Sequence, residues 1–204
     1  MGLIIGVLAL QGDFQEHALT LSQIGVASRE VRNPKDLIGI EGLILPGGES
    51  TTMAMLLESS GLFPEITRAL KDGLFVFGTC AGMILLAREV LDGRSDQGGF
   101  AVMDISVRRN GFGRQIRSFE ADLAVKGIEG PPIRAVFIRA PVVEKVAKEV
   151  EILAEVSYRF DDDSKRVIPV VCGQDRLLAC SFHPELTSDS RLHQLFISKI
   201  LSEK

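Results

Sequence analysis

Short apolar runs alternate with helix-like segments over residues 3–91 of the chain. The runs are rich in Val, Ile, Leu and Phe and end at glycine, proline or polar residues, which is typical of buried strands. Between them, apolar positions recur every three or four residues, which indicates amphipathic helices. The expected strands are 3–10, 26–31, 42–48 and 74–78, and the expected helices are 14–25, 50–61, 63–73 and 81–91. This alternation predicts a mainly parallel sheet flanked by helices.

After about residue 98 the pattern changes to β-rich segments separated by glycine, proline or charged clusters. The expected strands lie within 100–109, 119–127, 133–141, 150–158, 166–173 and 176–182, and a helix is expected at 190–204. Short connections between these strands favour an antiparallel β region added to the parallel sheet. Because 204 residues suit one sizeable core, we expect a single α/β domain over residues 1–204.

Charge and hydropathy narrow the possible partners. A net charge of −4 and a pI near 5.5 give no attraction to phosphate backbones, so no nucleic-acid partner is expected. No apolar stretch approaches the roughly 18 residues that cross a bilayer, so no membrane association is expected. The opening segment lacks a basic leader and a small-residue cleavage site, and its pattern is that of a first strand. The sequence therefore predicts a cytoplasmic protein that acts on small molecules or proteins.

The cysteines and histidines do not form a metal-binding pattern. Three widely spaced cysteines favour free thiols over a disulfide framework. Cys180 and His183 stand three residues apart, but a zinc site needs further ligands that the sequence does not provide. His17 and His193 lie within helical patterns, where we expect surface or half-buried side chains. We therefore expect neither a metal nor a cofactor.

Cys80 is the candidate nucleophile. It lies in Gly78-Thr79-Cys80-Ala81-Gly82, between a buried strand and a helix, which is the setting of a nucleophile elbow with sulfur in place of oxygen. Glycine at both ends would relieve crowding at the sharp turn, and the start of a helix stabilises a thiolate. The alternative is that Cys80 is a small buried core residue, the usual situation of a free cysteine and the one expected for Cys172 and Cys180.

His183 and Glu185 are the candidate base and its orienting carboxylate. Both follow the strand expected at 176–182, and Pro184 favours an extended backbone at His183. At a spacing of two, both side chains would then point to the same side. A carboxylate that accepts a hydrogen bond from one imidazole nitrogen leaves the other nitrogen free to face a thiol.

The segment LILPGGEST, residues 43–51, is a second strand that breaks into glycines before a helix. Gly47 and Gly48 can present backbone N–H groups as an oxyanion hole, together with the N–H of Ala81 after the nucleophile. The alternative is a simple tight turn with Glu49 and Ser50 acting as helix caps. The segment lacks the lysine of a phosphate-binding P-loop, so nucleotide binding is rejected.

Seven blocks occur in order from residue 6 to about residue 187: GVLALQGDFQEH, LILPGGESTTM, FGTCAGMILLA, RRNGFGRQ, SFEADL, FIRAP and CSFHPELT. Together they resemble the class I, triad-type glutamine amidotransferases, and among these the family of glutaminase subunits of pyridoxal 5′-phosphate synthase. PGGEST, RRNGFGRQ and FIRAP are more specific to this family than the triad is. The resemblance implies a flavodoxin-like three-layer sandwich.

The resemblance also implies roles for individual residues. Cys80 would be the nucleophile, His183 the base and acid, and Glu185 its orienting group. Glutamine binding would fall on Gly48, Glu49, Ser50, Arg109, Ile138 and Arg139. Gln11 would lie near the oxyanion loop when a partner is docked. Arginines beside strands are more often solvated, so the binding roles of Arg109 and Arg139 depend on the resemblance.

The implied reaction is hydrolysis of L-glutamine to L-glutamate and ammonia. The implied partner is the pyridoxal 5′-phosphate synthase subunit, a TIM-barrel protein that activates the glutaminase and receives the ammonia for vitamin B6 biosynthesis. Pyridoxal phosphate would be the pathway product and not a cofactor. The alternatives are a glutaminase serving another acceptor, a cysteine hydrolase or protease of similar architecture, and a regulatory subunit without turnover.

Overall fold

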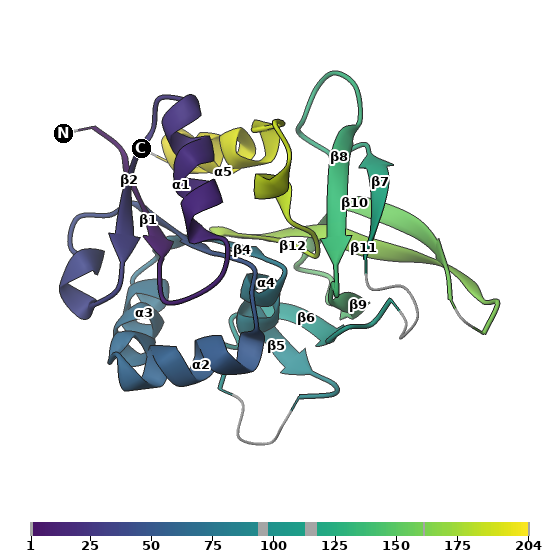
Figure 1. Cartoon of the computed structure of the whole chain (residues 1–204), viewed down its shortest axis with the longest axis horizontal. Helices are drawn as coiled ribbons and strands as arrows, with labels where there is room; N and C mark the ends of the chain where they lie inside the picture. Colours follow the sequence, from purple (N-terminus) through teal and green to yellow (C-terminus); the bar gives the residue numbers. More distant parts are fainter. Residues whose placement is uncertain (1, 94–97, 113–117, 161, 204) are drawn as a thin grey trace.

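A seven-stranded sheet crosses the centre of the protein, with helices on both of its faces (Figure 1). The computed structural model describes residues 2–93, 98–112, 118–160 and 162–203. In spatial order the strands are β10 (Glu151–Arg159), β11 (Lys165–Gln174), β12 (Leu177–Cys180), β4 (Phe75–Thr79), β3 (Gly42–Leu45), β1 (Ile4–Leu8) and β2 (Ala27–Val31). The strands from β12 to β2 are parallel, and β11 and β10 continue the sheet in antiparallel pairing. The expected parallel sheet with an antiparallel addition is confirmed.

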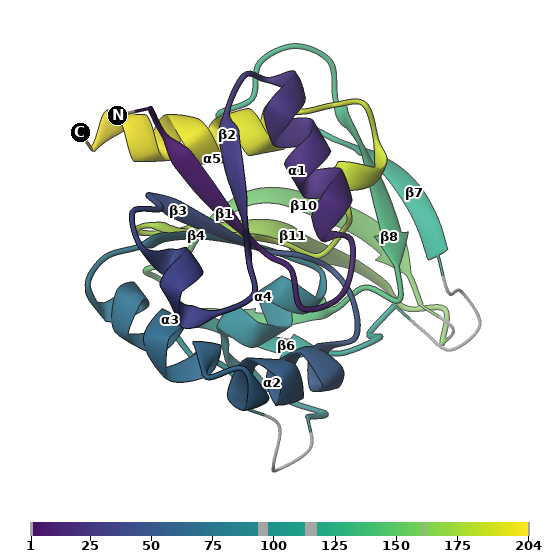
Figure 2. The same ribbon diagram turned by 60° about the vertical axis from the view of Figure 1, so that its left-hand side comes forward.

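The helices form the two outer layers, as Figure 2 shows from a second direction. One face of the sheet packs against α1 (Phe14–Gln23) and α5 (Arg191–Ser202), through Leu21, Phe196 and Ile200 among others. The other face packs against α2 (Ser50–Ser59), α3 (Leu62–Lys71) and α4 (Ala81–Leu86). The central strands β3, β4 and β12 are buried along their whole length, as continuous apolar runs in a covered parallel sheet should be. The three-layer α/β architecture expected from the sequence is therefore observed.

Two smaller sheets extend the molecule beside the main one. The first contains β5 (Ala87–Val90), β6 (Met103–Arg108) and β9 (Val142–Val146). The second is an antiparallel pair of β7 (Ser118–Leu123) and β8 (Ile133–Ile138). Short 3₁₀ helices occupy Pro34–Leu37 and Pro184–Leu186. Within the described residues, no helix combines the length and the apolar character needed to cross a membrane.

Three expectations from the sequence need correction. The helix expected at 81–91 ends at Leu86, because Ala87 turns to extended geometry with ψ 139° and residues 87–90 pair with β6 as β5. The strand β9, Val142–Val146, was not expected, since it lies between the strands expected at 133–141 and 150–158. The last strand, β12, was expected within the antiparallel addition. It pairs antiparallel with β11 on one side but parallel with β4 on the other, at the centre of the main sheet.

Candidate active site

Cys80 stands on a strained turn between β4 and α4. Its φ is 48°, a left-handed backbone conformation that is costly for a residue with a side chain. The neighbouring glycines are required by close packing: a Cβ on Gly82 would lie 2.1 Å from the carbonyl oxygen of Leu45, and one on Gly78 would lie 2.6 Å from the carbonyl carbon of Gly82. The expectation that both glycines relieve crowding at this turn is confirmed.

The pairing of β12 with β4 brings His183 to the same end of the sheet as Cys80. Cys180 at the end of β12 is in register with Thr79 at the end of β4, so both chains leave the sheet side by side. The His183 amide then donates to the carbonyl of Val136, at 2.9 Å, which fixes this segment against β8. Carboxyl ends of parallel strands are the usual location of sites in such folds.

His183 and Glu185 form a hydrogen-bonded pair, with 2.8 Å between Nδ1 and Oε1. Both are almost fully buried. The sequence predicted that both side chains point to one side from an extended segment. The segment is instead a 3₁₀ turn over Pro184–Leu186, and this turn folds the carboxylate back onto the ring. The two-residue spacing thus gives the expected contact through a different backbone geometry.

The electrostatics of the pair favour a charged imidazole. Burial by itself would lower the pKa of His183, but its interactions with Cys80 and Glu185 outweigh burial and raise that pKa to about 10. Burial raises the pKa of Glu185, and the hydrogen bond with His183 partly offsets this rise. At neutral pH, His183 therefore holds a proton that it can donate.

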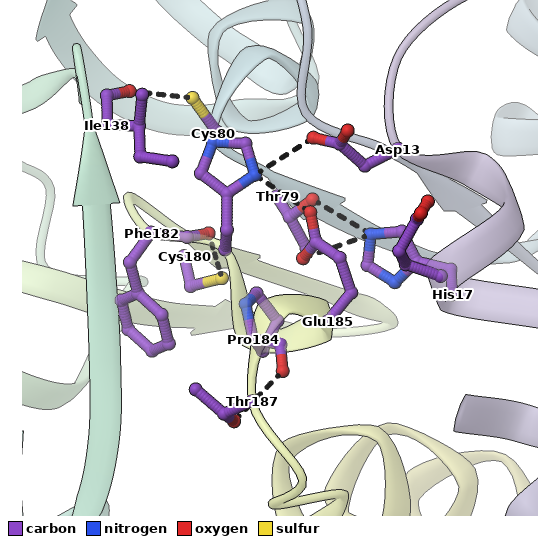
Figure 3. Close-up of polar contacts among 12 residues, drawn as sticks. Asp13, His17, Thr79, Cys80, Ile138, Cys180, Phe182, Pro184, Glu185 and Thr187 are labelled. Carbon is purple, nitrogen blue, oxygen red and sulfur yellow. Dashed lines mark hydrogen bonds and ion pairs between the residues drawn. The ribbon is translucent and has the colours of Figure 1, made fainter. Parts of the chain in front are cut away.

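Asp13 is a polar neighbour of His183 to which the sequence reasoning assigned no role. Its Oδ2 lies 3.4 Å from His183 Nδ1, on the side of the ring away from β8 (Figure 3). Asp13, His183 and Glu185 offer possible metal-ligand atoms within 4.8 Å of one another. The proton on Nδ1 that the carboxylates accept would have to leave before a cation could bind there, so the group is best described as hydrogen-bonded. The signal for Asp13 was its position in the block GVLALQGDFQEH.

A cavity of about 390 Å³ opens over Cys80 and His183. All six residues that the family resemblance assigned to glutamine binding line it together with this pair. The lining residues are Asp13, Gly48, Glu49, Ser50, Cys80, Ile84, Arg109, Asn110, Ile138, Arg139 and His183. The carbonyl oxygen of Ile138 faces the sulfur of Cys80 at 3.9 Å (Figure 3). Arg139 next to it has a φ of 45°, so a second strained residue borders the cavity.

The other predicted site residues lie just behind the cavity wall. Glu185 lies behind His183, and Ala81 begins α4. Gly47 packs against the imidazole so closely that a Cβ there would lie 2.2 Å from Cε1 of His183. Gln11 spans the next residues of the same loop: its Nε2 donates to the Glu49 carbonyl at 3.3 Å, and its Oε1 accepts from the Glu49 amide at 3.4 Å.

Glu49 is the N-cap of α2, as the alternative interpretation of the sequence proposed. Its carboxylate accepts hydrogen bonds from the backbone amides of Thr51 and Thr52 and from the Thr52 hydroxyl. Burial opposes ionisation, but these bonds outweigh it and lower the pKa of Glu49 to about 2. Arg109 contacts the same turn, since its Nη1 donates to the Thr51 hydroxyl at 3.1 Å. The first turn of α2 therefore holds both the Glu49 carboxylate and the Arg109 guanidinium at the cavity, one negative and one positive group on the same side.

The expectation for the two remaining histidines is wrong. His17 on α1 and His193 on α5 are both 0% exposed, not at the surface. His17 Nδ1 lies 2.8 Å from His193 Nε2, and His17 Nε2 lies 3.4 Å from Glu185 Oε2. The helical patterns around His17 and His193 did not indicate that these faces of α1 and α5 meet each other, or that His17 contacts the turn that carries Glu185.

Parts of two sequence features lie outside the described residues. These are residues 113–115 of the block RRNGFGRQ and residues 94–97 of the connection at 92–99. Arg109 of that block is described and lines the cavity.

Comparison with protein families and curated proteins gives one consistent result. The model of the SNO glutamine amidotransferase family matches residues 7–202. A pyridoxal 5′-phosphate synthase subunit PdxT from Frankia alni is 53% identical over 198 residues, covering 97% of this chain and 95% of that protein. A protein of the same description from Salinispora tropica is 52% identical, with 95% and 94% covered.

Solved structures agree at the level of the fold. A crystal structure described as a glutamine amidotransferase superposes with a TM-score of 0.86 at 44% identity, covering 96% of this chain and 98% of that one. The structure of PurLQS from Thermotoga maritima superposes with a TM-score of 0.67 at 16% identity, covering 100% and 99%. The second likeness concerns the fold alone.

Proposed function

This chain belongs to the SNO glutamine amidotransferase family, and on that premise we propose that Cys80, His183 and Glu185 hydrolyse L-glutamine and that the ammonia passes to a pyridoxal 5′-phosphate synthase partner. Membership makes the chain a glutaminase, the glutamine amidotransferase subunit of that synthase. The resemblance expected from the seven sequence blocks is thereby confirmed. A single domain over residues 1–204 and a cytoplasmic location belong to the proposal.

The observation that supports the triad most is the composition of one cavity. Cys80 and His183 line it together with the six residues expected to bind glutamine, although these come from positions 48 to 183 of the chain. An elbow cysteine and an imidazole held by a buried carboxylate are the parts that acyl transfer to sulfur requires. A core cysteine would need none of these neighbours.

The reaction proceeds in two halves. The Cys80 sulfur attacks the side-chain amide carbon of glutamine, and the protonated His183 donates its proton to the departing nitrogen, so ammonia leaves and a γ-glutamyl thioester remains. His183, neutral after that transfer, takes a proton from water as the water oxygen attacks the thioester carbon. The C–S bond breaks, glutamate leaves, and the Cys80 sulfur and protonated His183 return to their starting state. The raised pKa of His183, about 10, suits the first half because the ring carries its proton at neutral pH.

The oxyanion of each half forms against backbone N–H groups of Gly47, Gly48 and Ala81. Gly47 leaves no room for a side chain beside His183, and Gly48 has a φ of 147° that favours glycine. Preorganised backbone donors directed at a developing oxyanion contribute strongly to acyl transfer. Because Gln11 bonds the Glu49 backbone, a partner that moves Gln11 would move this loop, and partner-dependent activation follows.

Glutamine is held by charges of both signs. Arg109 and Arg139 face the α-carboxylate, and ionised Glu49 faces the ammonium group, with Ser50 and the Ile138 backbone completing the contacts. Ammonia released to bulk water would be protonated and lose its nucleophilicity. A sheltered path into a TIM-barrel synthase partner is therefore part of the proposal.

The deciding experiment measures glutamine hydrolysis by the chain alone and with the synthase subunit, followed by an assay for pyridoxal 5′-phosphate. We expect weak hydrolysis alone, a clear rise with the partner, and product formation from glutamine. Equal rates with and without the partner, with no product, would contradict the assignment to this synthase. Absence of hydrolysis under both conditions would contradict the triad.

A matched pair of arginine variants tests the binding residues. Arg139→Ala removes a cavity residue, and Arg134→Ala removes an arginine of the neighbouring strand β8 that pairs only with exposed Glu120 and Asp122 among the described residues. We expect KM for glutamine to rise about 10-fold or more in Arg139→Ala, because a charge-assisted contact is lost, and to stay unchanged in Arg134→Ala. Equal KM values for the two variants would remove Arg139 from the binding site.

A further inference from the structure

A group of buried polar side chains continues behind Glu185, away from the cavity. His17 of α1 lies beside Glu185 and Thr79 of β4 (Figure 3). On its other side it contacts His193 of α5, and the glutaminase mechanism uses neither histidine. His17 Nε2 is 3.4 Å from Glu185 Oε2 and 3.2 Å from the Thr79 hydroxyl, and His17 Nδ1 is 2.8 Å from His193 Nε2. His17, Thr79 and His193 are all 0% exposed, and His17 and Glu185 have side chains at 0%.

Both histidines are neutral in this environment. Burial, and next the repulsion that two protonated rings would exert on each other, lower the pKa of His17 well below its usual value. Burial lowers the pKa of His193 to about 4. Each ring therefore carries one N–H at neutral pH, and the direction of the hydrogen bond between the rings decides which nitrogen has it.

Two arrangements of these protons are possible, and they differ in what they leave unpaired. If His17 carries its proton on Nδ1 and donates to His193, His193 must carry its own on Nδ1, a buried atom without a partner in the described part of the chain. His17 Nε2 would then turn a lone pair toward a carboxylate oxygen. A buried donor without an acceptor and two facing lone pairs are both costly.

The opposite arrangement removes both conflicts. His193 Nε2–H donates to His17 Nδ1, and His17 Nε2–H donates to the Thr79 hydroxyl at 3.2 Å, with Glu185 Oε2 lying 3.4 Å from the same nitrogen. Oε2 accepts no hydrogen bond of standard geometry among the described residues, and His17 Nε2 lies within ion-pair distance of it, whereas Oε1 is bonded to His183. Each carboxylate oxygen then faces one imidazole N–H.

We propose that His17, held by His193, is a positioning residue of this glutaminase: its Nε2–H keeps the Glu185 carboxylate ionised and turned toward His183. The inference rests on the proposed function, because it assigns a role within the Cys80, His183 and Glu185 triad. His17 touches neither glutamine nor the reacting atoms. It acts through Glu185, and the contact connects α1 and α5 to the triad.

The groups that face Glu185 determine its pH dependence. They are His183 from its own turn, Asp13 from the segment before α1, His17 from α1, Cys180 from β12 and, on the far side of His183, Cys80. Among the side chains of the described residues that face Glu185, His17 is the one that brings a neutral imidazole N–H close to Oε2. Without it, burial and Asp13 favour the protonated acid, which no longer stabilises the imidazolium of His183.

The test compares His17→Met, which keeps the volume but has no donor, with His17→Gln, whose amide N–H can reach the same oxygen. With the synthase partner present, we expect kcat to fall about 10- to 100-fold in His17→Met with little change in KM, and His17→Gln to recover part of the loss. Leu21→Ala, in the same helix and equally buried, serves as the control for a loosened core.

A second readout does not depend on turnover. The rate at which iodoacetamide alkylates a cysteine follows its thiolate, so the pH profile for Cys80 reports its interaction with His183. We expect the profile to move to higher pH in His17→Met, and to stay closer to the parent profile in His17→Gln and at the parent position in Leu21→Ala. Coinciding profiles for the parent and His17→Met, or for the two His17 variants, would overturn the proposal.

Nitrogen NMR of the histidine rings tests the arrangement directly. We expect both His17 and His193 to be neutral with the proton on Nε2, assigned from the signals lost in His17→Gln and His193→Gln. A proton on His17 Nδ1 would overturn the proposal whatever the activity. If the tautomers and alkylation profiles are as expected but no chain hydrolyses glutamine, the positioning role stands and the proposed function fails.

Discussion

At the scale of single residues, His183 connects the chemistry of the site to the stability of the fold. Its pKa is about 10 in the folded chain against 6.5 for an ordinary histidine, so the folded state binds its proton more tightly than the unfolded state does. The resulting stabilisation is complete below pH 6.5 and is lost as the pH rises through 10.

This gives a prediction for the pH dependence of unfolding. Between pH 6.5 and 10, the urea midpoint of the parent chain should fall more steeply than that of His183→Asn, whose side chain does not titrate. The measurement is a urea titration at several pH values within this range. Parallel curves for the two proteins would show that His183 has no raised pKa.

The three cysteines should behave differently because their surroundings differ. Cys80 borders the cavity, whereas Cys172 lies in the core, where burial raises the pKa of its thiol to about 12. We expect Cys80→Ala to lower glutamine hydrolysis at least about 1,000-fold, since the nucleophile is lost, and Cys172→Ala to retain activity. Hydrolysis assays in the presence of the partner decide this, and residual activity in Cys80→Ala close to that of the parent would contradict the triad.

Individual residues were predictable where a local motif carries the chemistry. The elbow glycines and the two-residue spacing of His183 and Glu185 are short-range signals. The burial of His17 was not predictable, because its partners Thr79 and His193 lie 62 and 176 positions away in the sequence. An amphipathic helix pattern identifies apolar contacts, but it does not reveal a polar partner supplied by another element.

At the scale of elements, α4 begins where its backbone touches β3. Helix propensity alone predicts that Gly82→Ala stabilises α4 by about 1 kcal/mol. A Cβ there would lie 2.1 Å from the Leu45 carbonyl oxygen, which is backbone and cannot move aside without shifting β3. We therefore expect the opposite sign, a destabilisation of about 1–3 kcal/mol with a loss of glutamine hydrolysis.

Gly173→Ala in β11 is the matched control for this substitution. The nearest atom to its Cβ would be Leu153 Cδ1 at 3.4 Å, the end of a side chain that can move. Thermal unfolding of both variants measures the difference. A Gly82→Ala variant at least as stable as the parent would show that α4 and β3 can separate at no cost.

Most elements were predictable from periodicity, and the exceptions have a common cause. Residues 87–90 continue a helical pattern but form β5, because β6 provides an edge with which they pair. The local sequence determines the helix or strand propensity of a segment, but here the pairing with β6 decides between helix and strand. The same reason explains why β9 was not expected, since it also pairs with β6.

At the scale of the whole molecule, the cavity joins parts of the chain that are far apart in the sequence. Gly48, Glu49 and Cys80 come from the first half, and Arg139 and His183 from the second. Glutamine should therefore stabilise the entire fold. In the inactive Cys80→Ala chain, we expect about 2.7 kcal/mol of added stability at a glutamine concentration 100 times Kd.

Thermal unfolding with increasing glutamine measures this effect without turnover. Cys80→Ala combined with Arg139→Ala is the control, and it should respond only at higher concentrations because a binding contact is lost. Asparagine, whose side chain is one methylene shorter, should stabilise less at equal concentration. A melting temperature independent of glutamine would contradict binding in this cavity.

The overall sheet was predictable as a class, but the order of its strands was not. The segment at 176–182 looked like the last of a series of strands with short connections, yet β12 pairs in parallel with β4. Pairing over such a distance depends on both faces of the sheet being covered, which a local pattern does not contain. That single pairing is what brings His183 to Cys80.

The position of β12 has a consequence for protein synthesis. Because β12 lies between β4 and β11, a nascent chain that has been made only as far as residue 176 contains Cys80 but has neither His183 nor the strand that covers the edge of β4. Chains fold as they are made from the N-terminus. On the proposed mechanism such incomplete products do not release ammonia, and their exposed apolar strand edge can pair with other chains.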